Sequence, residues 1–177
     1  MNAAITTGAR LERGASRHPV IAFNGKLIRL LSRIPHSFIA LLGRFSIAAT
    51  FWQSGQTKVE GFAIDLVHGR FELGLPRLSE SAVDLFRDEY ALPVLPPELA
   101  ATLAATAEHV LPVLLLIGLA TRYSALGLLG MTLVIQTLVY PSAYPTHGLW
   151  AAVLLYLMAR GPGAFSADHL LSRRAGS

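Results

Sequence analysis

Three side chains that can do chemistry occur within stretches that are otherwise apolar: Arg44, Glu108 and His109. An ionisable group inside a lipid bilayer costs roughly 2.5 to 3.5 kcal/mol on insertion scales, so each such group needs a partner or a function. Arg44 follows Pro35 by nine residues and Glu108 follows Glu98 by ten, so both helical positions reach the middle of a ~30 Å hydrocarbon core. The sequence therefore predicts a polar site halfway across a membrane.

Antiparallel neighbouring helices would bring the Arg44 guanidinium and the Glu108 carboxylate together as a bidentate ion pair. In one interpretation this pair only fixes the register of two helices. In the other, Glu108 accepts a proton, or Arg44 donates a hydrogen bond to a quinone carbonyl or a ligand anion, and the two interpretations are compatible. His109 points about 100° away from Glu108, either as a second polar contact in the same cavity or as a core histidine with satisfied hydrogen bonds.

Other cofactor chemistry finds little support. The chain has no cysteine, so it cannot carry out thiol exchange or hold an iron–sulfur centre by its own thiolates. A haem between helices needs two histidines at similar depth, whereas His36 and His147 fall near opposite membrane edges and cannot level with His109. The dispersed His68 and His147 give only a weak pattern for a metal, so we expect no metal site.

The composition identifies lipid as part of the solvent. The 177 residues are 53% hydrophobic and only 15% charged, whereas a soluble domain is about one quarter charged. The net charge of +4 and the pI near 9.9 do not indicate nucleic acid, because the basic residues flank apolar runs and are not interleaved with aromatic ones. We expect the bilayer as a partner and no nucleic acid.

The apolar stretches predict an all-α membrane protein, a bundle of four transmembrane helices. Between Tyr123 and Ala159 there is no Asp, Glu, Lys or Arg, a length that fits two spans separated by a break at 141–148. The four spans are expected at about 35–53, 97–120, 123–140 and 147–160.

The first 33 residues are expected to lie outside the membrane domain of residues 34–177. Residues 1 to about 17 lack an apolar period and predict a disordered tail. From Asn24, a plausible N-cap, basic residues alternate with apolar ones at helical spacing, which predicts a basic amphipathic helix at the membrane surface. A short extension of the first span is the alternative, and no cleaved signal peptide is expected.

The long connection from Gln56 to Pro97 is too polar to cross lipid and predicts an extracytoplasmic cap between the first two spans. Ser81 and Asp84 resemble a capping box. A short helix should follow, ending before Pro93, with one side lined by Val83, Phe86 and Tyr90.

The distribution of positive charge predicts that both termini are cytoplasmic, because Lys and Arg are retained on that side. Four basic residues belong to the opposite side: Lys58, Arg70, Arg77 and Arg87. Ten belong to the side of the termini: Arg10, Arg13, Arg17, Lys26, Arg29, Arg33, Arg122, Arg160, Arg173 and Arg174.

From about Arg44 to its C-terminus the sequence resembles the DoxX-like membrane proteins. The resemblance rests on the order and spacing of several short pieces along the four spans. These are Arg44 followed by Ser54, Gly55 and Lys58; Leu85-Phe86 to Tyr90 and Pro93; Glu108 before Gly118-Leu119-Ala120-Thr121-Arg122; and Gly161-Pro162-Gly163 with Ser166 and Asp168.

The resemblance implies a four-helix inner-membrane protein, of a family in which some members are subunits of quinone-linked oxidoreductases or membrane partners of redox enzymes. Among the residues that carry the resemblance, Arg122 would cap a tight turn. Ser166 would start a short helix, and the negative charge of Asp168 would suit the dipole at the N-terminus of that helix. We therefore expect binding of a quinone or a similar lipid-like ligand and support of a soluble redox partner. A non-catalytic scaffold whose cap recruits an extracytoplasmic partner is one alternative, and a small-molecule carrier is another.

Overall fold

The computed structural model describes residues 19–65 and 69–175, so the tail expected at 1–17 lies outside the described residues. The chain divides into two units, residues 1–34 and 35–177. In the first, helix α1 (Pro19–Leu31) contains the basic segment. The helix begins at Pro19, so the expectation that Asn24 is its N-cap is wrong; proline suits a first turn because its missing N–H would be unpaired there anyway.

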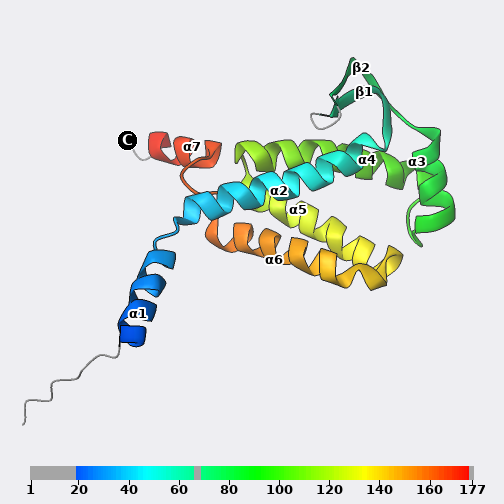
Figure 1. The fold of residues 1–177 in the computed structure, drawn as a ribbon. Coiled ribbons are helices and arrows are strands. Elements are labelled where there is room, and N and C mark those ends of the chain that lie inside the picture. The colour runs from blue at the N-terminus through cyan, green and yellow to red at the C-terminus, as the bar shows by residue number, and fades with distance from the viewer. Residues whose placement is uncertain (1–18, 66–68, 176–177) are drawn as a thin grey trace, which may run out of the picture. The chain divides into compact units, whose positions relative to one another are not determined.

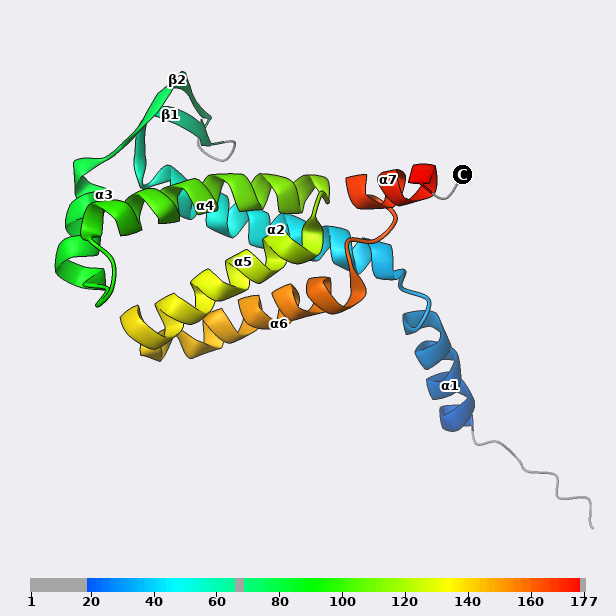
Figure 2. The same cartoon turned by 180° about the vertical axis from the view of Figure 1, so that it is seen from behind.

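In the second unit, four helices pack against one another: α2 (His36–Gln56), α4 (Pro97–Ile117), α5 (Thr121–Val134) and α6 (Tyr144–Arg160). Helix α2 lies alongside α4, and α5 lies alongside α6, as both views show (Figure 1, Figure 2). Between them lies a cluster of apolar side chains that are almost completely buried. It includes Ile47, Phe51, Leu115, Leu128, Leu154 and Leu157.

The outer surface of these helices is apolar as well. Large side chains such as Phe45, Leu116 and Leu155 are 60%, 44% and 52% exposed. Soluble monomers rarely expose continuous apolar surface of this kind, whereas lipid covers it without cost.

Two helical stretches are long and apolar enough to cross a membrane, Pro97–Ile117 and Thr121–Val139. The second joins α5 to the π-helical segment η2 (Ile135–Val139). A third span is counted if Phe23–Leu31 and His36–Gln56 act as one. The described chain is thus mostly helical, with two to three candidate spans where the sequence predicted four.

The connection between α2 and α4 departs from the all-α prediction, because it begins with two antiparallel strands, β1 (Val59–Asp65) and β2 (Arg70–Leu78). In β1 the bulky residues Phe62 and Ile64 are two apart, a spacing of period two that favours a strand. The register shifts between Glu60 and Phe62. There Gly61, at φ +77°, allows the two backbones to approach closely.

Two short helical segments complete this connection: α3 (Glu80–Asp84) and the π-helical η1 (Leu85–Tyr90). The N-cap of α3 is Ser79, whose Oγ accepts a hydrogen bond from Ala82 N at 3.2 Å. The expected capping box at Ser81 is therefore wrong by two residues. We call residues 57–96 the cap, and the end of the bundle that carries it the cap end.

At the opposite end, α4 turns into α5 over three residues. Gly118 (φ +72°) and Ala120 (φ +49°) both adopt left-handed backbone conformations, so the reversal is tight. Between α5 and α6 the chain forms η2 and the 3-10 turn η3 (Pro141–Ala143). The short helix α7 (Ala167–Ala175) follows α6 and lies at the end where α4 meets α5, which we call the α7 end (Figure 1).

Candidate functional site

A buried ion pair joins α2 to α4 at the cap end. Lys58 Nζ lies 2.7 Å from Glu108 Oε2, and the two side chains are only 4% and 3% exposed. Ser54 links them, because its Oγ donates to Glu108 Oε1 at 3.1 Å and accepts from Lys58 Nζ at 3.0 Å. The lysine also donates to the Ser54 carbonyl oxygen at 3.2 Å. Each charge is thus offset by the other and by hydrogen bonds, the condition under which buried charges are tolerated.

The expected ion pair between Arg44 and Glu108 is wrong, since Glu108 has Lys58 as its partner. The reason is the register of the two antiparallel helices. Glu108 lies opposite the end of α2, where a Cβ on Gly55 would come within 3.0 Å of Glu108 Cβ. Arg44 is eleven residues from Gly55, about 16 Å along the helix, so it lies opposite the other end of α4.

Arg44 instead lies against the α7 end, where it is fully buried. Its Nη2 donates a short hydrogen bond to the Phe165 carbonyl oxygen. The carboxylate of Asp168 attracts its charge. Among the described residues, Nε and Nη1 of Arg44 find no hydrogen-bond partner. The arginine therefore holds the segment before α7 against the bundle.

Asp168 connects α7 with the turn between α4 and α5. Its two carboxylate oxygens accept hydrogen bonds from Ala120 N at 2.8 Å and Thr121 N at 3.0 Å, and its own N–H donates to the Gly118 carbonyl at 2.9 Å. The carboxylate thus satisfies free N–H groups at the start of α5, where the helix dipole also favours a negative charge.

His109 is held by hydrogen bonds at both ring nitrogens. Nδ1 lies 2.7 Å from the Ala105 carbonyl oxygen, which can only accept, so Nδ1 carries the proton and donates. Nε2 lies 2.9 Å from Gln56 Nε2 and accepts from it. Gln56 is oriented for this role because its Oε1 accepts from Ile64 N at 2.7 Å. The ring is therefore fixed as the neutral Nδ1–H tautomer.

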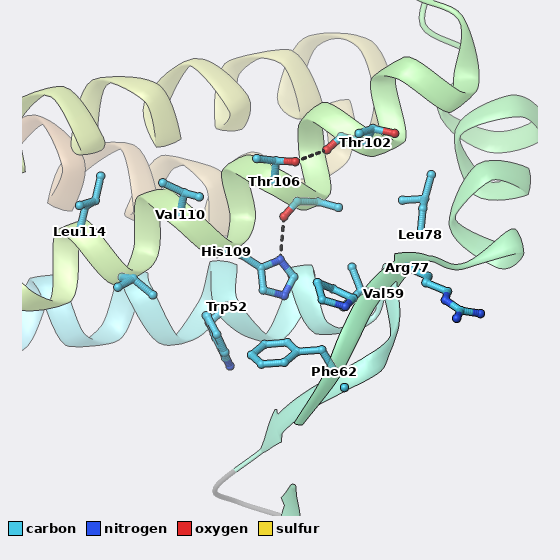
Figure 3. Close-up of a pocket in the computed structure, with 14 residues that line it drawn as sticks. Trp52, Val59, Phe62, Arg77, Leu78, Thr102, Thr106, His109, Val110 and Leu114 are labelled. Carbon is cyan, nitrogen blue, oxygen red and sulfur yellow. Dashed lines mark hydrogen bonds between the residues drawn. The ribbon is translucent and has the colours of Figure 1, made fainter. Parts of the chain in front are cut away.

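A groove of about 690 Å³ opens between α4 and the two strands, with His109 in its wall; we call it the His109 groove (Figure 3). Trp52 stands edge-on to His109, with 5.1 Å between ring centroids, and Phe62 lies 6.2 Å from both rings. Figure 3 shows Val110 and Leu114 along the α4 side and the Arg77 guanidinium at the far edge. The wall is apolar, and Thr102 and Thr106 direct their hydroxyls to carbonyls of their own helix.

Glu108 does not line the His109 groove, so the expectation of one cavity for both residues is wrong. It lines a second, smaller pocket of about 330 Å³ on another side of α4. Neighbouring helical positions differ by about 100° in direction, enough to separate the two side chains. Within the part of the chain that the structure describes, no cluster of His, Asp or Glu could hold a metal ion.

Comparison with known protein families shows which family the chain belongs to. The DoxX family model matches residues 39–141, more than half of the chain, and confirms the resemblance. The chain belongs to the DoxX family. No curated protein and no solved structure matches it significantly. With its apolar helices, this DoxX protein is a multi-pass membrane protein.

Part of the DoxX motif lies at the cap end. Ser54 and Lys58 are the partners of Glu108, and Gly55 makes room for the contact between the helices. A Cβ on Gly55 would come within 2.9 Å of His109 Cε1 and 3.0 Å of Glu108 Cβ. The glycine therefore lets α2 and α4 approach closely enough for the ion pair to form.

The remaining motif residues lie mostly at the α7 end. Thr121 begins α5, and Arg122 lies beside Gly161. Ser166 directly precedes α7 and its Oγ accepts from His169 N at 3.2 Å. A Cβ on Gly163, at φ +80°, would come within 2.7 Å of Ser37 Cα. The matched family region ends before Gly161, so this part of the DoxX pattern rests on the residues alone.

Tyr90 lies in the cap, packed at a tilt against Phe86 with 4.6 Å between ring centroids and edge-on to Tyr140 at 5.8 Å. Burial raises the pKa of the Tyr90 hydroxyl. Tyr140, directly after η2, donates a short hydrogen bond to Glu89 Oε1, and this bond raises the pKa of Tyr140 above its ordinary value. These contacts attach the cap to the end of α5.

The sequence did not reveal the residues that contact Glu108 and His109. The spacing of four residues between Ser54 and Lys58 is a signal that could have placed both on one side of a helix. Trp52 and Gln56 gave no signal, because they meet His109 only through the packing of α2 on α4. Phe62 meets it only after the strands fold back along α4.

Proposed function

We propose that this DoxX protein is a four-helix inner-membrane protein that binds a quinone or a similar lipid-like ligand and supports a redox partner. The observation that carries the proposal is the His109 groove, an apolar cavity of about 690 Å³ beside a helix that is apolar enough to span the membrane. Such volumes are typical of small-molecule sites. In this role the chain would be a membrane subunit of a quinone-linked oxidoreductase.

The groove suits a flat ring with an apolar tail. Trp52 and Phe62 offer aromatic surfaces for a ring, and Val113 and Leu114 of α4 offer aliphatic surface for a tail. Both nitrogens of His109 already have partners, so the histidine contributes its ring surface. Arg77 at the rim supplies donors for a carbonyl oxygen.

The membrane arrangement belongs to the proposal. Helices α2, α4, α5 and α6 would be the four spans, the cap would be extracytoplasmic, and both termini would be cytoplasmic, in agreement with ten basic residues against four. The chain has no cysteine, so single cysteines report without background. An impermeant maleimide should label a Glu72→Cys chain in intact cells and spare a Ser172→Cys chain; the reverse pattern contradicts this topology.

Ligand binding is tested by fluorescence, because the chain has two tryptophans and only Trp52 lines the groove. Trp150 packs against Phe51 and His147 elsewhere. In lipid nanodiscs, a short-chain ubiquinone should quench Trp52 emission saturably in the Trp150→Phe variant. Equal, non-saturable quenching in the Trp52→Phe variant would mean that the quinone only dissolves in the lipid.

A variant that fills the groove tests the site, and the same substitution outside the groove is its matched control. Thr106→Phe places a ring in the groove, whereas Thr137→Phe makes the same change on η2. Both threonines are exposed and donate to the carbonyl four residues earlier, so their local effects match. Saturable quenching should disappear only with Thr106→Phe, and its survival there would contradict the site.

A scaffold role is the second candidate, favoured by the exposed apolar residues of β2. Phe71, Leu73 and Leu75 are 62%, 81% and 84% exposed on one short strand. Surfaces of this kind mark interaction sites. If the cap recruits an extracytoplasmic protein, Leu73→Ser with Leu75→Ser should abolish its co-purification and leave Trp52 quenching unchanged.

A further inference from the structure

Two hydrogen bonds attach the hairpin of β1 and β2 to α2, and both are made by the main chain of Ile64. Its N–H donates to Gln56 Oε1 at 2.7 Å, and its carbonyl oxygen accepts from Trp52 Nε1 at 3.0 Å. Phe62 of the same strand lines the His109 groove (Figure 3). These two bonds therefore hold one wall of the groove in place.

Gln56 also connects Ile64 with His109, and the two ends of this chain of hydrogen bonds fix its direction. The Ile64 N–H can only donate, so the Gln56 atom that faces it is Oε1, and Nε2 of the same amide faces His109. At the other end the Ala105 carbonyl can only accept, so His109 carries its proton on Nδ1. His109 Nε2 is therefore an acceptor without a proton.

This chain of hydrogen bonds has no place for a second proton on His109. That proton would bind to Nε2, which lies 2.9 Å from Gln56 Nε2, so two donors would face each other. If the Gln56 amide turned over, Oε1 would accept from His109, but the NH₂ group would then face the Ile64 N–H. This turn is favoured, because a charged donor forms the stronger hydrogen bond and costs more when it is left unpaired. The bond to Ile64 is then lost.

Within the described part of the chain, the charged residues beside the contacts of His109 provide no other acceptor for Nε2. They are Lys58, Glu108, Arg77, Glu60 and Asp65. Lys58 and Glu108 neutralise each other, and Arg77 can only donate. Glu60 is exposed, and Asp65, three positions after Phe62, lies on the other face of β1. Gln56 is therefore the acceptor for that proton.

We propose that the bond between Gln56 and Ile64 is a pH-sensitive latch, closed while His109 is neutral and opened when His109 gains a second proton. Imidazole is the side chain whose charge ordinarily changes between about pH 5 and 8. Neutral pH therefore keeps the hairpin wall of the His109 groove in place, and acid pH loosens it. The latch consists of residues of this chain alone, so it does not depend on the proposed ligand.

Hydrogen exchange of the Ile64 amide measures the latch directly, because this N–H is the donor to Gln56. The full chain in lipid nanodiscs is measured at about pH 7.5 and about pH 5, with single-residue resolution. Dividing the intrinsic rate at each pH by the observed rate gives a protection factor. For Ile64 it should fall about tenfold at the lower pH, as expected for the loss of one hydrogen bond. Leu119, whose N–H donates to the Leu114 carbonyl at 2.9 Å near the α7 end, should keep its protection.

Two variants distinguish the latch from a general effect of acid. In Gln56→Glu both carboxylate oxygens accept, so the side chain can bond to Ile64 and to a doubly protonated His109 together, and protection should survive acid pH. His109→Gln cannot gain a proton in this range, so its protection should be equal at both pH values. Unchanged protection of Ile64 in the unmodified chain overturns the proposal. A fall that Leu119 shares, or that persists in either variant, overturns it as well.

Discussion

Lys58 and Glu108 form a charge pair 2.7 Å apart in the contact between α2 and α4, at the end where the cap begins. Lys58 is the second residue after α2, so the pair fixes both the end of that helix and the start of the cap. Glu108 also lines the smaller pocket, and its neighbour His109 lines the His109 groove. The ion pair and the proposed ligand site therefore share one short segment of α4.

Lys58→Met should destabilise the protein by about 3 to 5 kcal/mol, because it leaves the Glu108 carboxylate buried without a counter-charge. Chemical unfolding in detergent micelles measures the loss. Arg87→Met is the matched control, since Arg87 pairs with Asp84 at 2.7 Å and with Glu98 at 3.0 Å while all three side chains are exposed. Exposed ion pairs contribute little to stability, so this variant should lose far less. Equal losses in the two variants would show that burial of the Lys58 pair has no energetic consequence.

Gly118→Ala should destabilise the turn between α4 and α5. A Cβ there would lie 2.0 Å from Arg44 Nη1, and the φ of +72° alone costs a side chain roughly 1 to 2 kcal/mol. Gly130→Ala is the control, because a Cβ at that helical position meets nothing within 4 Å. It should be neutral or stabilise by about 0.5 to 1 kcal/mol. Thermal melting of the two variants distinguishes them, and a stable Gly118→Ala chain would contradict the buried position of Arg44.

Asp168→Ala should loosen α7, since it removes the acceptors for Ala120 N and Thr121 N. Loss of such a cap costs about 1 kcal/mol. Limited trypsin digestion should cleave after Arg173 faster in this variant than in the unmodified chain. Ser172→Ala, which removes only a hydrogen bond within α7, should not change the rate. Equal rates in all three chains would mean that Asp168 does not hold the helix.

The contact between Tyr140 and Glu89 predicts a change at alkaline pH. The hydrogen bond raises the pKa of Tyr140 in the folded protein, so its contribution to stability is complete below the unfolded value of about 10. It is lost as the pH rises from there through the raised pKa. The 295 nm absorbance difference between the unmodified chain and Tyr140→Phe isolates this titration. Glu89→Gln should lower its midpoint, and Glu80→Gln elsewhere in the cap should not.

The sequence by itself determined the solvent and the residues available for chemistry. The shortage of charge and the long apolar stretches follow from composition, which is why helices α4 and α5 and the DoxX resemblance could be read without coordinates. Arg44, Glu108 and His109 stood out for the same reason, because a polar residue is conspicuous in an apolar stretch.

Only the tertiary structure decided which of these residues meet. Positions along one helix can be counted, but the register between the antiparallel helices α2 and α4 places Glu108 beside Gly55 and Arg44 beside Gly118, at opposite ends of the pair. The strands of the cap then bring Phe62 and the Ile64 backbone to Trp52, Gln56 and His109. Partners distant in the chain depend on helix rotation and on the path of the cap, and neither leaves a local pattern.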